Sequence, residues 1–518
     1  MKMTKQLMGL FCFYFGWCLP ALGSEPTNIG SRLELFVDAH LIDSMKGVIR
    51  KLHSPQPKGP VMAFDQPWEG AATGNVTVFD DGIPGGTPSY NMYYVGIPMR
   101  GDYRDYPNIY GPPVVCLAQS RDGVHWTRPN LKIFTGEFTD RYGKKFTIPE
   151  PNNIVWIGQG KYVNTSDNFV PFKDTNPNCK TEARYKAIGR YLHLPDTAPP
   201  TPDNTGYPWP PGAGLMALQS PDGIHWSLMQ QERIIKKTET DAQNVAFWDS
   251  LRGEYRCYTR VKRKDGTFLR SIATLTSKDF IHWSDPPIWL DYRDAPEEHL
   301  YNDCILPYYR APHIYLGMIM RLVPGRRWVE NHPEAEISDA IFMSSRDGVH
   351  FDRSFVEGWI RPGLDLQHES WLHGNTAPAW GLLATAPGEL SVYWIDHSQQ
   401  LDSIPQLQRG TLRTDGFVSV NAKHDGGEFT TKPLRFTGVA LRMNISTSAI
   451  GSVRVEIQDA AGKPIPGYTL DDCTEIFGDS LEQVARWKGG SYVGKLAGKP
   501  IRLRFVLKDA DLYAIRFR

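Results

Sequence analysis

Three carboxylic residues occupy equivalent positions in successive units of a repeated sequence and could take part in one reaction. Asp241, Asp303 and Glu369 each precede the first strand that we predict in their unit. Hydrolysis of a glycosidic bond requires two carboxyl groups that flank the bond, one as acid and one as base or nucleophile. We expect Glu369 to be the general acid, because the nearby Trp371 gives it an apolar setting that raises a carboxyl pKa. Asp303 or Asp241 would then be the base or nucleophile, and the other would orient the pair.

Other side chains near these positions could bind a sugar. Polar side chains can exchange hydrogen bonds with sugar hydroxyls, and aromatic rings can stack on sugar faces. The predicted substrate-binding residues are His299, His373, Trp371, Asn244, Glu69, Trp68 and Tyr301. Each carboxylate also has a structural alternative, since an Asp at a strand end often caps a turn. Asp38 and Glu69 are reserve catalytic candidates, and a structural Asp38 would join the first strand to the last repeat.

A seven-residue pattern, Ser-x-Asp-x-x-His-aromatic, occurs four times in the chain. The copies lie at residues 120–126, 220–226, 277–283 and 345–351, and a degenerate copy occupies 413–417. The Ser and Asp side chains are expected to bind backbone N–H groups in a hairpin turn, where Gly adopts a positive φ. The following aromatic residue would pack between neighbouring sheets. Because the His always stands next to the aromatic residue, we interpret it as structural and not as a metal ligand.

The repeats predict a five-bladed β-propeller over residues 24–420. In the third unit, strands are expected at 245–249 and 255–260, a third directly before the turn and a fourth after it. This is the arrangement of one propeller blade, whose innermost strand lines a central cavity. In the second unit, the segment before the first predicted strand contains Glu150, Asn152 and Asn153. Alternating apolar and polar residues over 421–518 predict a C-terminal β-sandwich, with a structural or a glycan-binding role.

Composition and the N-terminus indicate an exported protein with many turns. The chain has 47 Gly and 40 Pro, and its 57 Lys and Arg balance 57 Asp and Glu, so the basic surplus of a nucleic-acid binder is absent. Residues 1–23 are typical of a signal peptide, with Lys2 and Lys5 before an apolar run and small residues before Ser24. We expect a secreted or periplasmic protein with no membrane span after cleavage, and an uncleaved anchor is the alternative.

Cysteines and metal-ligand motifs predict neither a metal site nor a cofactor. The cysteines after residue 23 are odd in number and widely scattered, at Cys116, Cys179, Cys257, Cys304 and Cys473. This spacing is unlike that of a zinc site, and we expect mostly buried, apolar roles, with one or two disulfides left open. The predicted partner is a carbohydrate substrate, and the oligomeric state is open.

The repeats, the signal peptide and the order of propeller and sandwich resemble the five-bladed β-propeller glycoside hydrolases. This group includes the invertase/fructanase and arabinanase/xylosidase families, and the chain is most similar to secreted bacterial proteins described as glycosyl hydrolase family 32-like or family 43-like. The segments 35–42 and 413–419 carry the resemblance, which covers nearly the whole mature chain. It implies hydrolysis of a poly- or oligosaccharide by an Asp–Asp–Glu set on successive blades, the order of residue types at Asp241, Asp303 and Glu369.

Two departures keep other functions open. The invertase-type motif Trp-x-Asn-Asp-Pro-Asn is absent, and the string Tyr292-Arg293-Asp294-Ala295 lacks the proline of Arg-Asp-Pro, which argues against sucrose or fructan cleavage. The turns also resemble the Asp-box of sialidases, which would bring three clustered arginines. The alternatives are therefore a sialidase-like exo-glycosidase and a non-catalytic carbohydrate-binding propeller. Arg321, Arg326 and Arg327 could recognise an acidic substituent or belong to a solvated loop.

Overall fold

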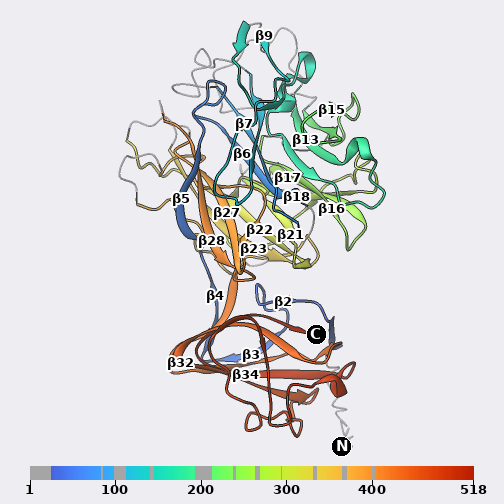
Figure 1. The fold of residues 1–518 in the computed structure, drawn as a ribbon, viewed down its shortest axis with the longest axis vertical. Helices are drawn as coiled ribbons and strands as arrows, with labels where there is room; N and C mark the ends of the chain where they lie inside the picture. Colours follow the sequence, from blue (N-terminus) through green and yellow to red (C-terminus); the bar gives the residue numbers. More distant parts are fainter. Residues whose placement is uncertain are drawn as a thin grey trace, which may run out of the picture.

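The computed structural model consists almost entirely of β-strands arranged in two parts (Figure 1). It describes residues 25–518 apart from 83–85, 99–111, 140–144, 193–212, 237, 239–240, 263–268, 293–294, 331–334, 365–369 and 399–402. The larger part contains five antiparallel sheets of four or five strands and a separate two-stranded hairpin, and the smaller part contains one ten-stranded sheet. Short 3-10 helices are η2 (Gly160–Ser166), η3 (Thr181–Ala183) and η4 (Gly494–Leu496).

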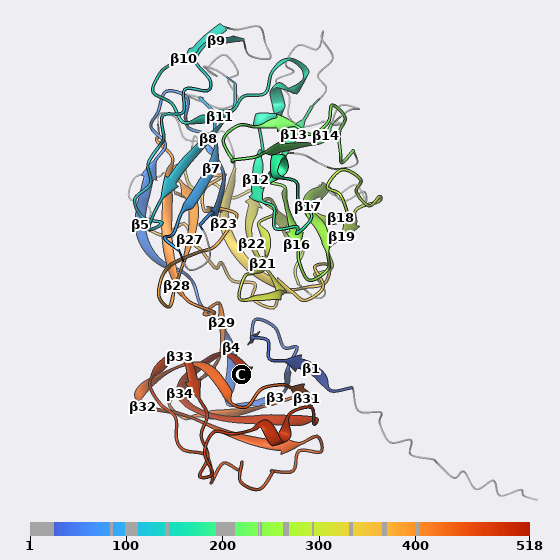
Figure 2. The ribbon, with the colours of Figure 1, turned by 45° about the vertical axis from the view of Figure 1, so that its right-hand side comes forward.

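The five sheets are the blades of a β-propeller, as predicted. Blade one contains β6 (Gly74–Asp80), β7 (Tyr90–Gly96), β8 (Val114–Ser120) and β11 (Ile154–Trp156). Blade two contains β12 (Val170–Lys173), β13 (Tyr185–Tyr191), β14 (Gly214–Ser220) and β15 (Ser227–Leu228). Blade three contains β16 (Val245–Asp249), β17 (Glu254–Lys262), β18 (Arg270–Ser277) and β19 (Ile288–Trp289). A hairpin of β9 (Gly136–Thr139) and β10 (Lys145–Ile148) projects from the top of the propeller (Figure 2).

The last two blades each have an additional short strand. Blade four contains β20 (His299–Leu300), β21 (Ile305–Tyr308), β22 (Ala311–Pro324), β23 (Glu336–Ser345) and β24 (Phe351–Asp352). Blade five contains β25 (Ala377–Pro378), β26 (Leu383–Ala386), β27 (Glu389–Asp396), β28 (Gln406–Arg413) and, from the beginning of the chain, β5 (Gln56–Ala63). Because β5 pairs antiparallel with β28, the N-terminal segment closes the ring of blades. The prediction that the fourth strand of each unit follows its turn is wrong for blade five, whose turn lies at 413–417.

The strand after that turn belongs to the smaller part. This sheet contains β1 (Thr27–Gly30), β2 (Glu34–Leu35), β3 (Ile42–Lys46), β4 (Val48–Leu52), β29 (Val418–Ala422), β30 (Gly427–Thr431), β31 (Leu434–Phe436), β32 (Leu441–Asp459), β33 (Asp479–Val484) and β34 (Ile501–Phe517). Its apolar core combines Phe36 and Ile42 with Phe505. Residues 27–52 therefore contribute strands to this sheet and not to a blade. The division of the chain at residue 420 and the sandwich architecture remain predictions.

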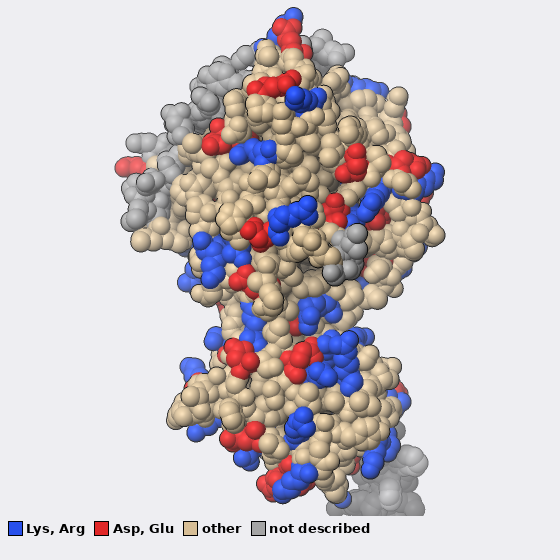
Figure 3. All heavy atoms as spheres, viewed as in Figure 1, with Lys and Arg blue, Asp and Glu red and all other residues tan. Residues whose placement is uncertain are grey.

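Ion pairs connect the two parts. Arg346, in the turn of blade four, contacts Asp38 at 2.6 Å and Glu34 at 2.8 Å. Asp38 thus has the structural role that we gave as the alternative to catalysis. Its partner, however, lies in blade four and not in the last blade. On the face shown in Figure 3, basic and acidic residues are interspersed over both parts. The five described cysteines are free thiols, four of them buried.

The repeated turns have the predicted geometry. In the first copy, Ser120 Oγ accepts the N–H of Gly123 at 2.9 Å, and Asp122 Oδ1 accepts the N–H groups of Val124 and His125 at 2.8 Å each. The His125 ring contacts Asp122 Oδ2 at 2.7 Å. The other three full copies repeat this set. The structural interpretation of the histidines is therefore confirmed.

Tyrosines of one blade bind the turns of the next. Tyr393 Oη donates to the Gly123 carbonyl at 2.7 Å, and Tyr93 Oη donates to that of Gly223 at 2.9 Å. Gly223 has a φ of +79°, and a Cβ there would lie 2.5 Å from Tyr93 Oη. A side chain at this position is therefore excluded by backbone conformation and by contact with the neighbouring blade.

We expect Gly223→Ala to destabilise the protein by roughly 1–3 kcal/mol. The substitution places an alanine in the left-handed backbone region and breaks a contact between blades. Urea unfolding measures the loss. Gly253→Ala is the matched control, since Gly253 has a φ of +62° but nothing within 4 Å of an added Cβ. Equal losses in both variants would show that the contact with Tyr93 contributes nothing.

Candidate active site

A pocket of about 160 Å³ lies where the first strands of the blades meet. Every blade contributes a polar side chain to its lining, namely Asn75, Asn168, Asp241, Asn302 and His373 from blades one to five. The lining begins at the start of β6 and includes Ile97 just after β7. Because neighbouring strands are antiparallel, the Ser-x-Asp turns, which follow the third strand of a blade, lie at the opposite end. The repeat therefore builds the propeller but does not reach this pocket.

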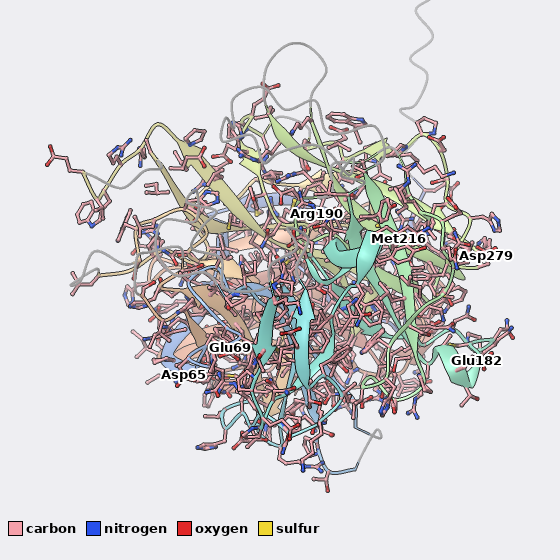
Figure 4. The ribbon with its side chains drawn as sticks, turned by 90° about the horizontal axis from the view of Figure 1, so that it is seen from above. Asp65, Glu69, Glu182, Arg190, Met216 and Asp279 are labelled. Carbon is pink, nitrogen blue, oxygen red and sulfur yellow. The ribbon has the colours of Figure 1, made fainter. Side chains whose placement is uncertain are left out.

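Two carboxylates from neighbouring blades line the pocket and share one cation. Arg190 Nη1, on β13, lies 2.6 Å from Asp167 Oδ2 and 3.0 Å from Asp241 Oδ1. Arg260 Nη2, on β17, adds a second contact with Asp241, at 3.5 Å. Viewed from above, Arg190 lies near the middle of the molecule, whereas the turn residue Asp279 lies at the periphery (Figure 4). The arginines hold both carboxylates next to the pocket.

The charge state of Asp241 follows from these contacts. Burial raises the pKa of its carboxyl, but the charges of Arg190 and Arg260 outweigh burial and hold the pKa below its ordinary value. Although the surrounding protein limits its contact with bulk water, 42% of its side-chain surface is exposed, so the ionised carboxylate is accessible from the pocket. Asp241 is therefore suited to act as a base or nucleophile and not as a proton donor at neutral pH.

Asp167 was not among the predicted site residues, because the first strand of blade two was predicted at the wrong segment. Residues 154–156 form β11, the outer strand of blade one, so Glu150, Asn152 and Asn153 do not precede an inner strand. Asn153 instead donates to Tyr94 Oη at 2.8 Å and to the Leu117 carbonyl inside blade one. The inner strand of blade two is β12, which begins three residues after Asp167. A signal was present, since Asp and a following Val-x-Phe occur at 167–172 and again at 241–247.

Left-handed backbone positions recur around the pocket. Asn75, the second residue of β6, and Asn168 and Thr376, which precede the inner strands of blades two and five, have φ values of +51°, +52° and +55°. Asn75 Nδ2 donates to Asn168 Oδ1 at 2.6 Å, which joins two of these positions. Such conformations in residues other than glycine cost free energy and concentrate at functional sites.

Two of the predicted substrate-binding residues line the pocket, and a third lies behind them. The rings of Tyr301 and His373 meet edge to face, with centroids 5.6 Å apart. The guanidinium carbons of Arg260 and Arg270 lie 5.0 and 5.3 Å from the centre of the Tyr301 ring. His299 Nδ1 lies 3.2 Å from Arg270 Nη1, and burial lowers the pKa of His299, so its neutral ring can accept this hydrogen bond.

Three other predicted binding residues make contacts within the protein. Asn244 is fully buried, and its Oδ1 accepts from Thr259 Oγ1 at 2.7 Å. Trp68 is 6% exposed and donates to Asn153. The Glu69 carboxylate has no exposed surface and accepts from Tyr94 Oη at 2.5 Å and from Arg128. Sequence position alone does not separate such buried side chains from residues that face a pocket.

The remaining predicted residues do not line the pocket or cannot be described. Glu369 lies outside the described residues. Asp303 is fully buried, and neither carboxylate oxygen has a hydrogen-bond partner in the described structure. Burial holds the pKa of Asp303 well above its ordinary value, although the charge of Arg260 opposes this. Arg321 pairs with Asp339 and Glu298, so its charge is satisfied within blade four.

Asp303 gives a testable dependence of stability on pH. Above the pKa of the unfolded chain, the folded protein keeps a proton on Asp303 that the unfolded chain has released, so stability falls as pH rises. We expect Asp303→Asn to remove this contribution, which is at most about 1.4 kcal/mol per pH unit. The free energy of unfolding of Asp303→Asn, relative to that of wild type, should therefore increase between about pH 5 and pH 8. Urea unfolding of both proteins measures it.

A constant difference between the two proteins would contradict a protonated Asp303. The activity of the same variant tests the predicted catalytic role separately. A loss of more than about 10²-fold in kcat/KM, in a folded protein, would support that role.

The comparisons with known proteins concern the fold. No protein-family model and no curated protein matches the sequence. A similar solved structure is the family 32 β-fructofuranosidase of Bombyx mori, with a TM-score of 0.39, 9% identity, and 88% of this chain and 94% of that chain covered. An endo-arabinase from Bacteroides thetaiotaomicron has a TM-score of 0.33 and 11% identity, with 68% of this chain and 96% of that chain covered. An N-acetylgalactosamine deacetylase from F. plautii, in complex with blood group B trisaccharide, has a TM-score of 0.39 and 12% identity, with 71% of this chain and 96% of that chain covered.

Glycoside hydrolases are among these neighbours, as the resemblance led us to expect, and the five blades of the structure confirm the predicted propeller. At these identities and TM-scores, substrate and chemistry must be argued from the pocket itself. Within the described ranges, no helix is long and apolar enough to span a membrane.

Proposed function

We propose that this chain is a glycoside hydrolase that cleaves a poly- or oligosaccharide in the pocket where the first strands of the blades meet. The observation that carries the proposal is the pair of pocket-lining carboxylates, Asp167 and Asp241, that Arg190 holds from two neighbouring blades. Glycoside hydrolysis requires two carboxyl groups that flank the bond to be cleaved. Export to the periplasm or beyond, inferred from residues 1–23, would bring the enzyme to extracellular glycans.

Each residue has a proposed role. Asp241, kept ionised by its arginines, acts as base or nucleophile at the anomeric carbon. Asp167 orients this carboxylate through their shared contact with Arg190. Glu369 stays our predicted proton donor to the leaving oxygen, four residues before the pocket-lining His373 in the sequence. Tyr301 and His373 bind the sugar, while Arg260 supports both Asp241 and Tyr301.

A panel of poly- and oligosaccharides tests the proposal. New reducing ends, measured after incubation with the full mature chain, are the expected result. Binding to one of these glycans without any release of reducing ends would favour the alternative, a carbohydrate-binding propeller that does not catalyse. The panel includes arabinans, fructans, mannans and sialylated or uronate-containing oligosaccharides, so that a negative result covers several sugar classes.

A second candidate is a sialidase-like exo-glycosidase that acts on an acidic sugar. The specific observation is the presence of Arg190, Arg260 and Arg270 around Asp241 and Tyr301, the arginine cluster that we set as the criterion. Two of these arginines pair with Asp241, so they also fit the first proposal. Release of a terminal acidic sugar, with no cleavage of neutral glycans, would favour the second candidate.

A further inference from the structure

Two tryptophans form an aromatic pair at the surface of blades four and five. The rings of Trp328 and Trp371 have centroids 5.7 Å apart and an interplanar angle of 34°. Trp328 lies in the loop between β22 and β23 and is 53% exposed. Trp371 Nε1 donates to the Gly363 carbonyl at 2.9 Å, and the next residue, Leu364, is 86% exposed. An exposed apolar cluster of this kind marks a binding surface more often than a scattered surface residue does.

The strands and segments that carry this pair also build the pocket. Met320, on β22, lines the pocket on one side of the Trp328 loop. Glu336, the first residue of β23, lies on the other side, and its Oε2 is 3.1 Å from Nδ1 of the pocket-lining His373. Trp371 lies two residues before His373 in the chain. Trp328 is therefore connected to the pocket through the described residues 320–328, and Trp371 through residues 371–373.

We infer that Trp328 and Trp371 form a second carbohydrate subsite, which holds a sugar ring next to the ring bound in the pocket. An indole presents a rigid apolar face at a low cost in conformational entropy, and the C–H groups of a sugar ring offer a matching surface. The inference rests on the proposed function and extends it, because it requires a substrate of at least two units. Trp328 had no predicted role, whereas Trp371 was predicted to bind substrate.

Binding experiments test the subsite without requiring catalysis. A glycan array carrying arabinan, fructan, mannan and uronate oligosaccharides of one to six units is probed with the full mature chain. Wild type should bind oligosaccharides more tightly than the corresponding monosaccharides. Trp328→Ala should lose about tenfold in affinity for the oligosaccharides, with unchanged binding of the monosaccharides.

Trp289→Ala is the matched control, because Trp289 is 40% exposed on β19 at the outer edge of blade three. Equal affinities of Trp328→Ala and wild type for all oligosaccharides would overturn the inference, and so would the absence of oligosaccharide binding across the array. A wild-type dimer in analytical ultracentrifugation that becomes monomeric in Trp328→Ala would overturn it too, since a second copy of the chain would then occupy the surface. Oligosaccharide binding that depends on Trp328 without release of reducing ends would contradict the proposed function but support the subsite.

Discussion

Asp241→Asn is expected to lower kcat/KM by at least about 10³-fold and to leave the fold intact. The amide has nearly the same shape, and its oxygen can still accept from Arg190, so the packing between blades two and three is kept. It carries no negative charge and therefore cannot act as base or nucleophile. Release of reducing ends from the best glycan of the panel measures the effect, and the urea midpoint reports the fold.

The control for this substitution is Asp339→Asn. Asp339 also pairs with an arginine, Arg321, and its side chain is 18% exposed, but it does not line the pocket. We expect the control to keep most of the hydrolytic activity. If both variants lose activity equally, the effect of Asp241→Asn reports general damage to the propeller. If Asp241→Asn retains full activity, Asp241 is not the catalytic carboxylate.

Arg190→Leu should reduce hydrolysis by about 10²-fold or more and should also change its pH dependence. The substitution frees both carboxylates to move, because the contacts at 2.6 and 3.0 Å disappear together. It also removes the largest charge that lowers the pKa of Asp241. Since Asp241 acts in its ionised form, a higher pKa moves the acidic limb of the kcat/KM profile to higher pH.

Arg190→Lys separates charge from geometry. The lysine keeps the positive charge but not the planar guanidinium, so the acidic limb should stay near that of wild type while the rate falls. A purely structural role for Arg190 predicts that both variants lose rate with no movement of the acidic limb. That result would remove Arg190 from the mechanism.

The sequence predicts the blades well because their signals are local. Each Ser-x-Asp turn satisfies its own hydrogen bonds within a few residues, so its geometry is encoded where the motif stands. The closure of the ring by β5 depends on pairing with β28, hundreds of residues away in the chain, and has no local signal. For the same reason, β29 was misassigned to blade five when it pairs with β4.

The site was harder to predict than the fold. Asp241, Tyr301 and His373 were found because they stand at equivalent positions before inner strands. Asp167 was missed because β12 has only four residues and follows the 3-10 helix η2, which the repeat pattern does not predict. Glu69 stood at a similar position in the sequence, yet the structure buries it against Tyr94 and Arg128. Whether a carboxylate faces a pocket or an arginine depends on contacts between distant segments.

The most direct test is hydrolysis in water enriched in oxygen-18, followed by mass spectrometry of the products. With wild type, we expect one heavy oxygen at each new reducing end of a cleaved oligosaccharide, and with Asp241→Asn we expect no product. Wild-type protein that binds glycans but forms no labelled product with any member of the panel would contradict the proposal that this propeller is a glycoside hydrolase.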